Sequence, residues 1–97
     1  MRISKVQKSA LFYLYVIEQQ RGIKPLVSVD LLALVNRSLN SEVASSNFRA
    51  SCHTLRAHGL LTLYRTRSLT MAWLLTDSGR EKAKSIYQDM TAKRERA

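Results

Sequence analysis

The sequence predicts a small α+β domain, mostly α, in which a helix, a short strand, two further helices, a two-stranded hairpin and a C-terminal helix follow one another. Three observations support this prediction. The 97 residues allow one modest core and no second domain. Apolar residues recur at helical spacing in four segments, and two β-forming stretches lie between the third and the fourth. We therefore expect one domain over residues 1–92, followed by a basic, solvated tail over 93–97.

The first helix is predicted from Ser4 to about Gln20, with the Ser4 hydroxyl capping its first turn. Its inward stripe consists of Val6, Ala10, Tyr13, Leu14 and Ile17. Leu11, Phe12 and Tyr15 point away from this stripe, so the second half of the helix is apolar nearly all round, which indicates burial on two sides. In so small a domain, we expect the second side to contact another subunit.

Two shorter elements are expected before the third helix. Gly22 and Pro25 end the first helix, and residues 26–29 form a short extended stretch. Ser28 or Asp30 then caps a second helix of about two turns over "LLALVN", residues 31–36. The polar stretch "RSLNSEVASS" that follows is short enough to be a turn or a single helical turn.

The third helix is predicted over residues 45–58, because Ser45 or Ser46 can begin it and Gly59 is a typical helix stop. At about 100° per residue, one face carries Phe48, Cys52 and Leu55 and belongs to the core. The opposite face carries Ser46, Ala50, His53 and Ala57, flanked by Asn47, Arg49, Thr54 and Arg56. Small residues beside hydrogen-bonding ones suit close approach to base edges or phosphates.

Two further features favour an anion at this helix. No acidic residue lies between Val43 and Arg56, and the first-turn amides beside Ser45 and Ser46 suit a phosphate. The alternative for Arg49 and Arg56 is an ordinary solvated helix face. His53 is either a contact on this face or a bystander. His58 is expected to cap the end of the helix.

The hairpin is predicted from "LLTLYR" and "SLTMAWLL", joined by Thr66 and Arg67 in a tight turn. Arg65 and Arg67 then carry positive charge to its tip, for a polyanion or simply to keep a hairpin edge soluble. Tyr64 and Trp73 could stack on single-stranded bases, but packing of one strand face on the core explains them more simply.

The last helix is expected to begin with Thr76 or Asp77 as its cap and Glu81 near its first turn. Its apolar stripe consists of Ala83, Ile86, Tyr87 and Met90. Together with the outward side of the first helix, this stripe supplies the residues expected to form a homodimer interface, which are Leu11, Phe12, Tyr15, Tyr87 and Met90.

Composition limits the function. A net charge of +9 attracts polyanions such as nucleic acid, acidic proteins or anionic lipid. A single cysteine excludes an internal disulfide framework and favours a reducing, cytoplasmic compartment, and Cys52 is expected to be a buried, inert thiol. The longest apolar run, residues 10–17, is too short for a membrane span.

Metal binding and catalysis find little support. One cysteine and two histidines without CxxC or HxxxH spacing do not readily close a tetrahedral site, so no metal and no cofactor is expected. The chain has no Gly-rich phosphate loop, no Ser/His/Asp arrangement and no carboxylate pair. We therefore expect a binding protein and not an enzyme.

Residues 55–79 resemble one family of folds. "LRAHGLL", the arginine-bearing hairpin and "LLTDSGR" are similar to the stretch in MarR-like and PadR-like bacterial regulators where a recognition helix ends in Gly-Leu-Leu and the second wing strand leads into Leu-Thr-x-x-Gly. The chain is also similar to small proteins carried on plasmids and integrative elements, some of them segregation proteins. The resemblance implies a winged helix with a three-helix core, a two-stranded wing hairpin and a C-terminal helix.

The resemblance also implies a function. It predicts a double-stranded DNA-binding regulator of transcription with helix 45–58 in the major groove and wing 64–68 on the backbone or in the minor groove. The DNA-binding residues would be Ser45, Ser46, Asn47, Arg49, Ala50, His53, Arg56, Arg65 and Arg67. MarR-like proteins have longer flanking helices, which form the dimer and hold ligands, so no small-molecule effector is expected for this shorter chain.

Three alternatives remain at this point. The same basic face could meet an acidic protein, which would make the chain a winged-helix protein-interaction module. It could bind A-form RNA or a ribosome. It could also serve a mobile element as a partition or excision factor, which would use the same DNA-binding surface as a transcriptional regulator.

Overall fold

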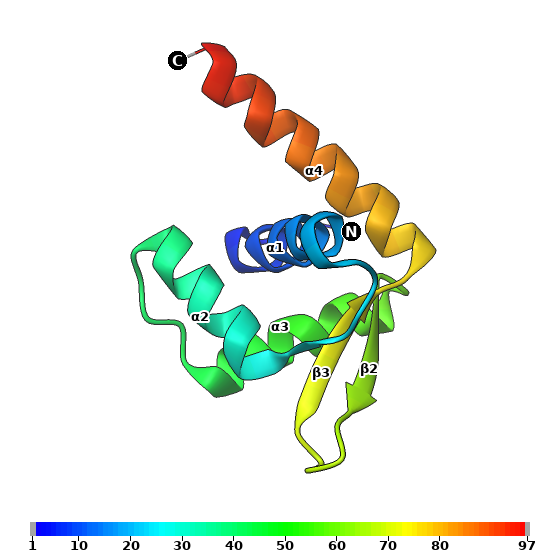
Figure 1. Cartoon of the computed structure of the whole chain (residues 1–97). Helices are drawn as coiled ribbons and strands as arrows, with labels where there is room; N and C mark the ends of the chain where they lie inside the picture. The colour runs from blue at the N-terminus through cyan, green and yellow to red at the C-terminus, as the bar shows by residue number, and fades with distance from the viewer. Residues whose placement is uncertain (1, 97) are drawn as a thin grey trace.

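A computed structural model describes the backbone of residues 2–96 and the side chains of residues 2–93. In this range the chain forms four helices and one three-stranded antiparallel sheet. Figure 1 shows the helices and the hairpin. The predicted α+β, mostly helical class is confirmed. The elements in chain order are α1 (Lys5–Arg21), β1 (Leu26–Val27), α2 (Ser28–Leu39), α3 (Ser45–Ala57), β2 (Leu61–Arg65), β3 (Met71–Leu75) and α4 (Asp77–Arg96).

The helix starts follow local hydrogen bonding. Ser4 caps α1 as predicted, because its hydroxyl accepts from the Gln7 amide at 3.1 Å while the Gln7 side chain accepts from the Ser4 amide at 2.9 Å. The cap predicted for α2 is wrong. That helix begins at Ser28 after Val27, without a side-chain cap, and Asp30 lies inside its first turn. It also continues to Leu39, so part of the expected turn 37–46 is helical.

The sheet has the strand order β1-β3-β2. The hairpin pairs β2 with β3, and the extended stretch before α2 adds the third strand through the pairs Leu26 with Trp73 and Val27 with Ala72. We define the wing as β2, β3 and the loop 66–70 between them; its strand β3 is the central strand of the sheet and is paired on both sides. Figure 1 shows its tip projecting away from the helices.

The tight two-residue turn predicted at Thr66 and Arg67 is wrong. The Thr66 amide donates to the Thr70 carbonyl and the Leu69 amide donates to the Thr66 carbonyl, both at 2.9 Å, so three residues lie between the closing pair. Leu69 has a φ of 62°, in the left-handed region. This arrangement corresponds to a turn followed by a left-handed residue, a common three-residue hairpin connection.

The core lies between α1, α2, α3, the sheet and α4. Its buried side chains include Leu11, Leu31, Phe48, Leu55, Trp73 and Ile86. Leu11 is fully buried, so the prediction that it faces another subunit is wrong. The inward side of α1 carries Gln7, Ala10, Leu11, Leu14 and Glu18, and is rotated from the predicted stripe. Glu18 also lies on this side, where it is buried and pairs with Arg80 of α4.

α4 is fixed where it leaves the sheet. The Thr76 hydroxyl accepts from the Gly79 amide at 2.9 Å, which confirms Thr76 as a cap, and donates to the Gly59 carbonyl at 2.6 Å. The helix continues to Arg96, so the backbone of the basic tail expected at 93–97 is helical as far as that residue, and residue 97 lies outside the described part. None of the helices in the described part is long and apolar enough to cross a membrane.

Candidate nucleic-acid interface

The outer face of α3 is exposed over its whole length. Its exposed residues are Ser45, Ser46, Asn47, Arg49, Ala50, His53, Thr54, Arg56 and Ala57. Phe48, Cys52 and Leu55 are buried on the other side, as the helical spacing predicted. Every residue of α3 that was predicted to contact DNA is therefore accessible from solvent.

The N-terminus of α3 is free of side-chain caps. The helix begins at Ser45 after Ala44, and no side chain of the described residues accepts from its first turn. The preceding loop is held separately, because the Asn36 side chain accepts from the Val43 amide at 2.8 Å. The first-turn amides and the Ser45 and Ser46 hydroxyls thus remain available to an anion, which the helix dipole favours at this end.

The two predicted wing arginines occupy different positions. Arg65 is the last residue of β2, where it pairs with Met71, and its Nη1 donates to the Leu69 carbonyl at 3.3 Å. Arg67 lies in the loop and is exposed. Arg65 therefore both carries charge and holds the loop, whereas Arg67 is a free cation at its tip.

A cleft of about 280 Å³ joins the helix to the wing. It is lined from α3 by Ser45, Phe48 and Arg49 and from the tip end of the wing by Thr70 and Met71. The start of α2 supplies the remaining lining residues, Ser28, Val29 and Leu32. Arg49 and the wing thus border one hollow, and the exposed side of α3 and the wing form a continuous surface, which we call the basic face.

The charges of the basic face have no carboxylate partners. Among residues 2–93, the salt bridges join Arg80 to Glu18 and to Asp77, away from α3 and the loop. Arg49, Arg56 and Arg67 are exposed and make no ion pair within that range. An external anion would therefore not have to displace an internal one.

Several side chains near the basic face have structural roles. His53 is exposed, but its ring also lies edge to face against the buried Trp73, with ring centroids 5.2 Å apart. This contact fixes the position of His53 on the core. Burial raises the pKa of the Cys52 thiol to about 12, and the free thiol lies in the core. Groups of His, Cys, Asp and Glu with metal-binding geometry do not occur within the described part.

The prediction that Tyr64 and Trp73 both pack on the core from one face of the hairpin is wrong. Trp73 is fully buried, but Tyr64 is 44% exposed. The register explains the difference, because Leu63 pairs with Trp73 and Tyr64 pairs with Ala72, and neighbouring residues of a strand point to opposite faces. Tyr64 and Leu69 are thus the exposed large apolar side chains of the wing. Sequence reasoning missed Leu69, although it is the apolar residue among the polar residues of the loop 66–70.

A second surface lies along α1 and α4. Phe12 stacks on Tyr87 with ring centroids 5.8 Å apart, and Tyr15 lies 5.4 Å from the same ring. Tyr87 is 38% exposed and Met90 is 42% exposed. The structure thus brings together four of the five predicted dimer residues and leaves Leu11 in the core.

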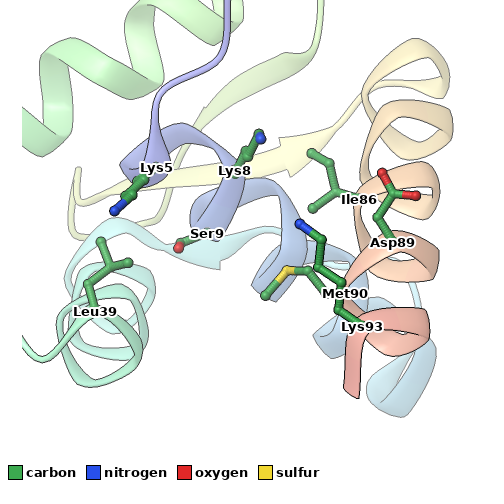
Figure 2. A pocket seen from close by; sticks show the side chains of 8 residues that line it. All are labelled: Lys5, Lys8, Ser9, Leu39, Ile86, Asp89, Met90 and Lys93. Carbon is green, nitrogen blue, oxygen red and sulfur yellow. The ribbon is translucent and has the colours of Figure 1, made fainter. Parts of the chain in front are cut away.

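Two hollows between α1, α2 and α4 flank these residues, beside a smaller one that Tyr15 and Tyr87 line. One, of about 500 Å³, is lined by Phe12, Tyr13, Ser38, Tyr87, Met90, Thr91 and Lys93. The other, of about 360 Å³, has an apolar floor of Leu39, Ile86 and Met90 and a rim with Lys5, Lys8 and Lys93 (Figure 2). Both belong to α1, α2 and α4, and so lie apart from the basic face.

The fold has close counterparts among solved structures. A transcriptional regulator of the MarR family from Silicibacter pomeroyi superposes with a TM-score of 0.75 at 20% identity, over 97% of this chain and 56% of its own. MepR from S. aureus in complex with DNA gives a TM-score of 0.65 at 21% identity, over 94% of this chain and 62% of its own. The chain therefore has a MarR-like winged-helix fold, as the resemblance implied.

The chain spans about three fifths of the length of these regulators. SSV1 F-93 is similar in size, with a TM-score of 0.66 at 17% identity over 93% of this chain and 92% of its own. No protein-family model matches the sequence, and no curated protein is significantly similar to it.

Proposed function

We propose that this chain is a double-stranded DNA-binding transcriptional regulator. The observation that carries the proposal is the basic face, on which the exposed side of α3 and the wing border one cleft and their arginines have no carboxylate partner among residues 2–93. A helix of this kind fits the major groove while the wing reaches the flanking backbone or minor groove. The similarity to MepR, which was solved in complex with DNA, supports the same function.

Different residues of the basic face would contact different parts of the DNA. Ser45, Ser46 and the free amides of α3 would hold a phosphate at the edge of the major groove. Asn47, Arg49, Ala50, His53 and Arg56 would face base edges, with Ala50 permitting close approach. Arg65 and Arg67 would contact phosphates, which adds affinity without sequence information.

Salt dependence of binding tests this proposal. We expect the wild-type chain to bind a random-sequence duplex at low salt, measured by fluorescence anisotropy. The double variant Arg65→Ala/Arg67→Ala should bind more weakly. Its slope of log affinity against log salt should become shallower by about one to two units, because binding releases about one counterion fewer for each phosphate contact that is removed. Lys82→Ala/Lys84→Ala, on the exposed side of α4, removes the same charge and serves as the matched control.

The outcomes separate the alternatives. An equal change of slope in both double variants would mean that net charge and not the wing determines binding. No duplex binding at low salt by a folded chain would contradict the proposal and favour an acidic protein partner. A-form RNA that outcompetes the duplex would favour an RNA-binding protein.

We also propose that two copies associate through α1 and α4. The support is the aromatic cluster of Phe12, Tyr15 and Tyr87, in which Tyr87 is exposed and the other two rings are half-buried, with the exposed Met90 beside it and hollows that side chains of a second copy could fill. Two-fold symmetry would then place two copies of α3 on half-sites about one helical turn apart. The interface would leave both basic faces free.

The mass in solution tests this association. Tyr15→Asp/Tyr87→Asp should convert a dimer to a monomer in sedimentation equilibrium, since both side chains are partly exposed and both would meet the second copy. Ser78→Asp/Ser85→Asp, which are exposed positions of α4 outside the hollows beside Tyr15 and Tyr87, should leave the mass unchanged. A wild-type chain with the mass of one copy at all concentrations would contradict the proposal.

A further inference from the structure

Leu69 is the most unusual residue of the wing. It has a φ of 62° and is 73% exposed, the highest exposure among the large hydrophobic residues of the described part. The other non-glycine residue with a positive φ in that part is Asn40, whose short polar side chain tolerates this conformation. Leucine has no such tolerance, because its Cβ approaches the following carbonyl oxygen.

The loop itself requires this conformation. Hydrogen bonds from the Thr66 amide to the Thr70 carbonyl and from the Leu69 amide to the Thr66 carbonyl close a connection whose third loop residue is left-handed. Glycine or asparagine suits this position, and the side chain of leucine gains no burial there to offset the strain. A strained and exposed apolar side chain is an observation from which a functional role can be inferred.

The loop is ordered before any ligand arrives. The Thr66 and Ser68 hydroxyls lie 3.0 Å apart, those of Ser68 and Thr70 lie 3.1 Å apart, and Arg65 donates to the carbonyl of Leu69 itself. These contacts hold the Leu69 backbone so that its side chain stands out from the tip. A preorganised loop loses less conformational entropy when it binds.

The neighbours of Leu69 select its partner. Arg65 and Arg67 border it and have no carboxylate partner among residues 2–93, so the surface that accepts Leu69 must be apolar at its centre and anionic around it. The minor groove of a duplex has this character, with sugar and base edges between two rows of phosphates. Apolar side chains inserted there unstack a base step and kink the duplex.

We propose that Leu69 is a wedge that enters the minor groove and partly unstacks one base step, while Arg65 and Arg67 hold the phosphates on either side. The inference rests on the proposed DNA-binding function and adds a mode of sequence preference to it. Pyrimidine–purine steps such as TpA are the easiest to unstack. The wing therefore favours sites with a TpA step under its tip, without a hydrogen bond to any base.

Two duplexes of equal length and composition test the wedge. One contains alternating TpA steps and the other an AAATTT tract, and both carry 2-aminopurine in that segment. We expect the wild-type chain to bind the TpA duplex about tenfold more tightly, as partial burial of one leucine would allow, and to raise its 2-aminopurine fluorescence. Leu69→Gly should still bind both duplexes, with neither the preference nor the fluorescence change.

Leu69→Gly is a suitable variant because glycine fits the loop conformation without strain. Its thermal midpoint should lie within a few degrees of the wild-type value, or above it. Leu69→Met, which keeps an apolar side chain of similar volume, is the matched control and should retain most of the preference and of the fluorescence change.

Three results would overturn the inference in different ways. A Leu69→Gly chain that keeps both the TpA preference and the fluorescence signal would remove the wedge but leave DNA binding in place, and a change of oligomer mass in that variant would assign Leu69 to a protein contact. A wild-type chain that binds neither duplex at low salt would refute the proposed function itself, and the wedge with it.

Discussion

The two ends of the wing hairpin are held in opposite ways. At its base, contacts join residues that are far apart in the sequence. Glu18 accepts from Arg80 at 2.7 and 3.1 Å, and the Thr76 amide donates to the Leu60 carbonyl at 3.2 Å. At its tip, the side-chain hydrogen bonds join residues two to four positions apart and are exposed or half-buried.

This difference separates stability from recognition. Long-range contacts at the base join β2 and β3 to the helices and so fix the angle at which the hairpin leaves them. Each of these contacts closes a long loop, so it forms only when the whole domain is folded. Local contacts at the tip only shape the loop and leave Arg67 and Leu69 free to meet another molecule. Substitutions at the base should therefore lower the stability of the domain, whereas substitutions at the tip should change binding alone.

The largest effect is expected at Arg80. Its hydrogen bond with Glu18 raises the pKa of the guanidinium, a group that is charged in any case, and Glu18 is almost fully buried. Arg80→Leu would leave a buried carboxylate without a partner, which costs on the order of 3 kcal/mol in the free energy of unfolding. Urea denaturation followed by circular dichroism measures this loss.

A double-mutant cycle sharpens the result. Glu18→Gln/Arg80→Leu removes the buried charge together with its partner, so it should be less destabilising than the sum of the two single variants. Lys84→Leu, on the exposed side of α4, is the matched control and should change stability by less than about 0.5 kcal/mol. Additive losses in the cycle would mean that the ion pair is not what holds the base.

Much of the fold follows from local sequence signals. Ser4, Thr76 and Gly59 end or begin helices as predicted, because caps depend on a few neighbouring residues. The exposed face of α3 follows in the same way from helical spacing alone. The start of α2 was missed because Ser28 begins that helix directly after a strand, without a side-chain cap.

The errors arose where distant residues decide the structure. The inward side of α1 includes Glu18, whose partner Arg80 lies 62 residues away, so the local spacing of apolar residues did not predict it. The exposure of Tyr64 depends on the register with β3. The left-handed conformation of Leu69 was not predicted, because the loop 66–70 lacks the glycine or asparagine that normally marks such a turn.

Gly79 provides a smaller test of the same base. A Cβ built on this residue would lie 1.9 Å from the Leu60 carbonyl oxygen, which is backbone that the Thr76 amide also holds, so the contact cannot be relieved by a side-chain rotation. Gly79→Ala should lower the free energy of unfolding by about 2 kcal/mol despite the higher helix propensity of alanine. Ser78→Ala, at the exposed neighbouring position, should cost far less. If Gly79→Ala were as stable as the wild type, the close approach of α4 to Leu60 would not be needed, and the glycine in "LTDSGR" would need another explanation.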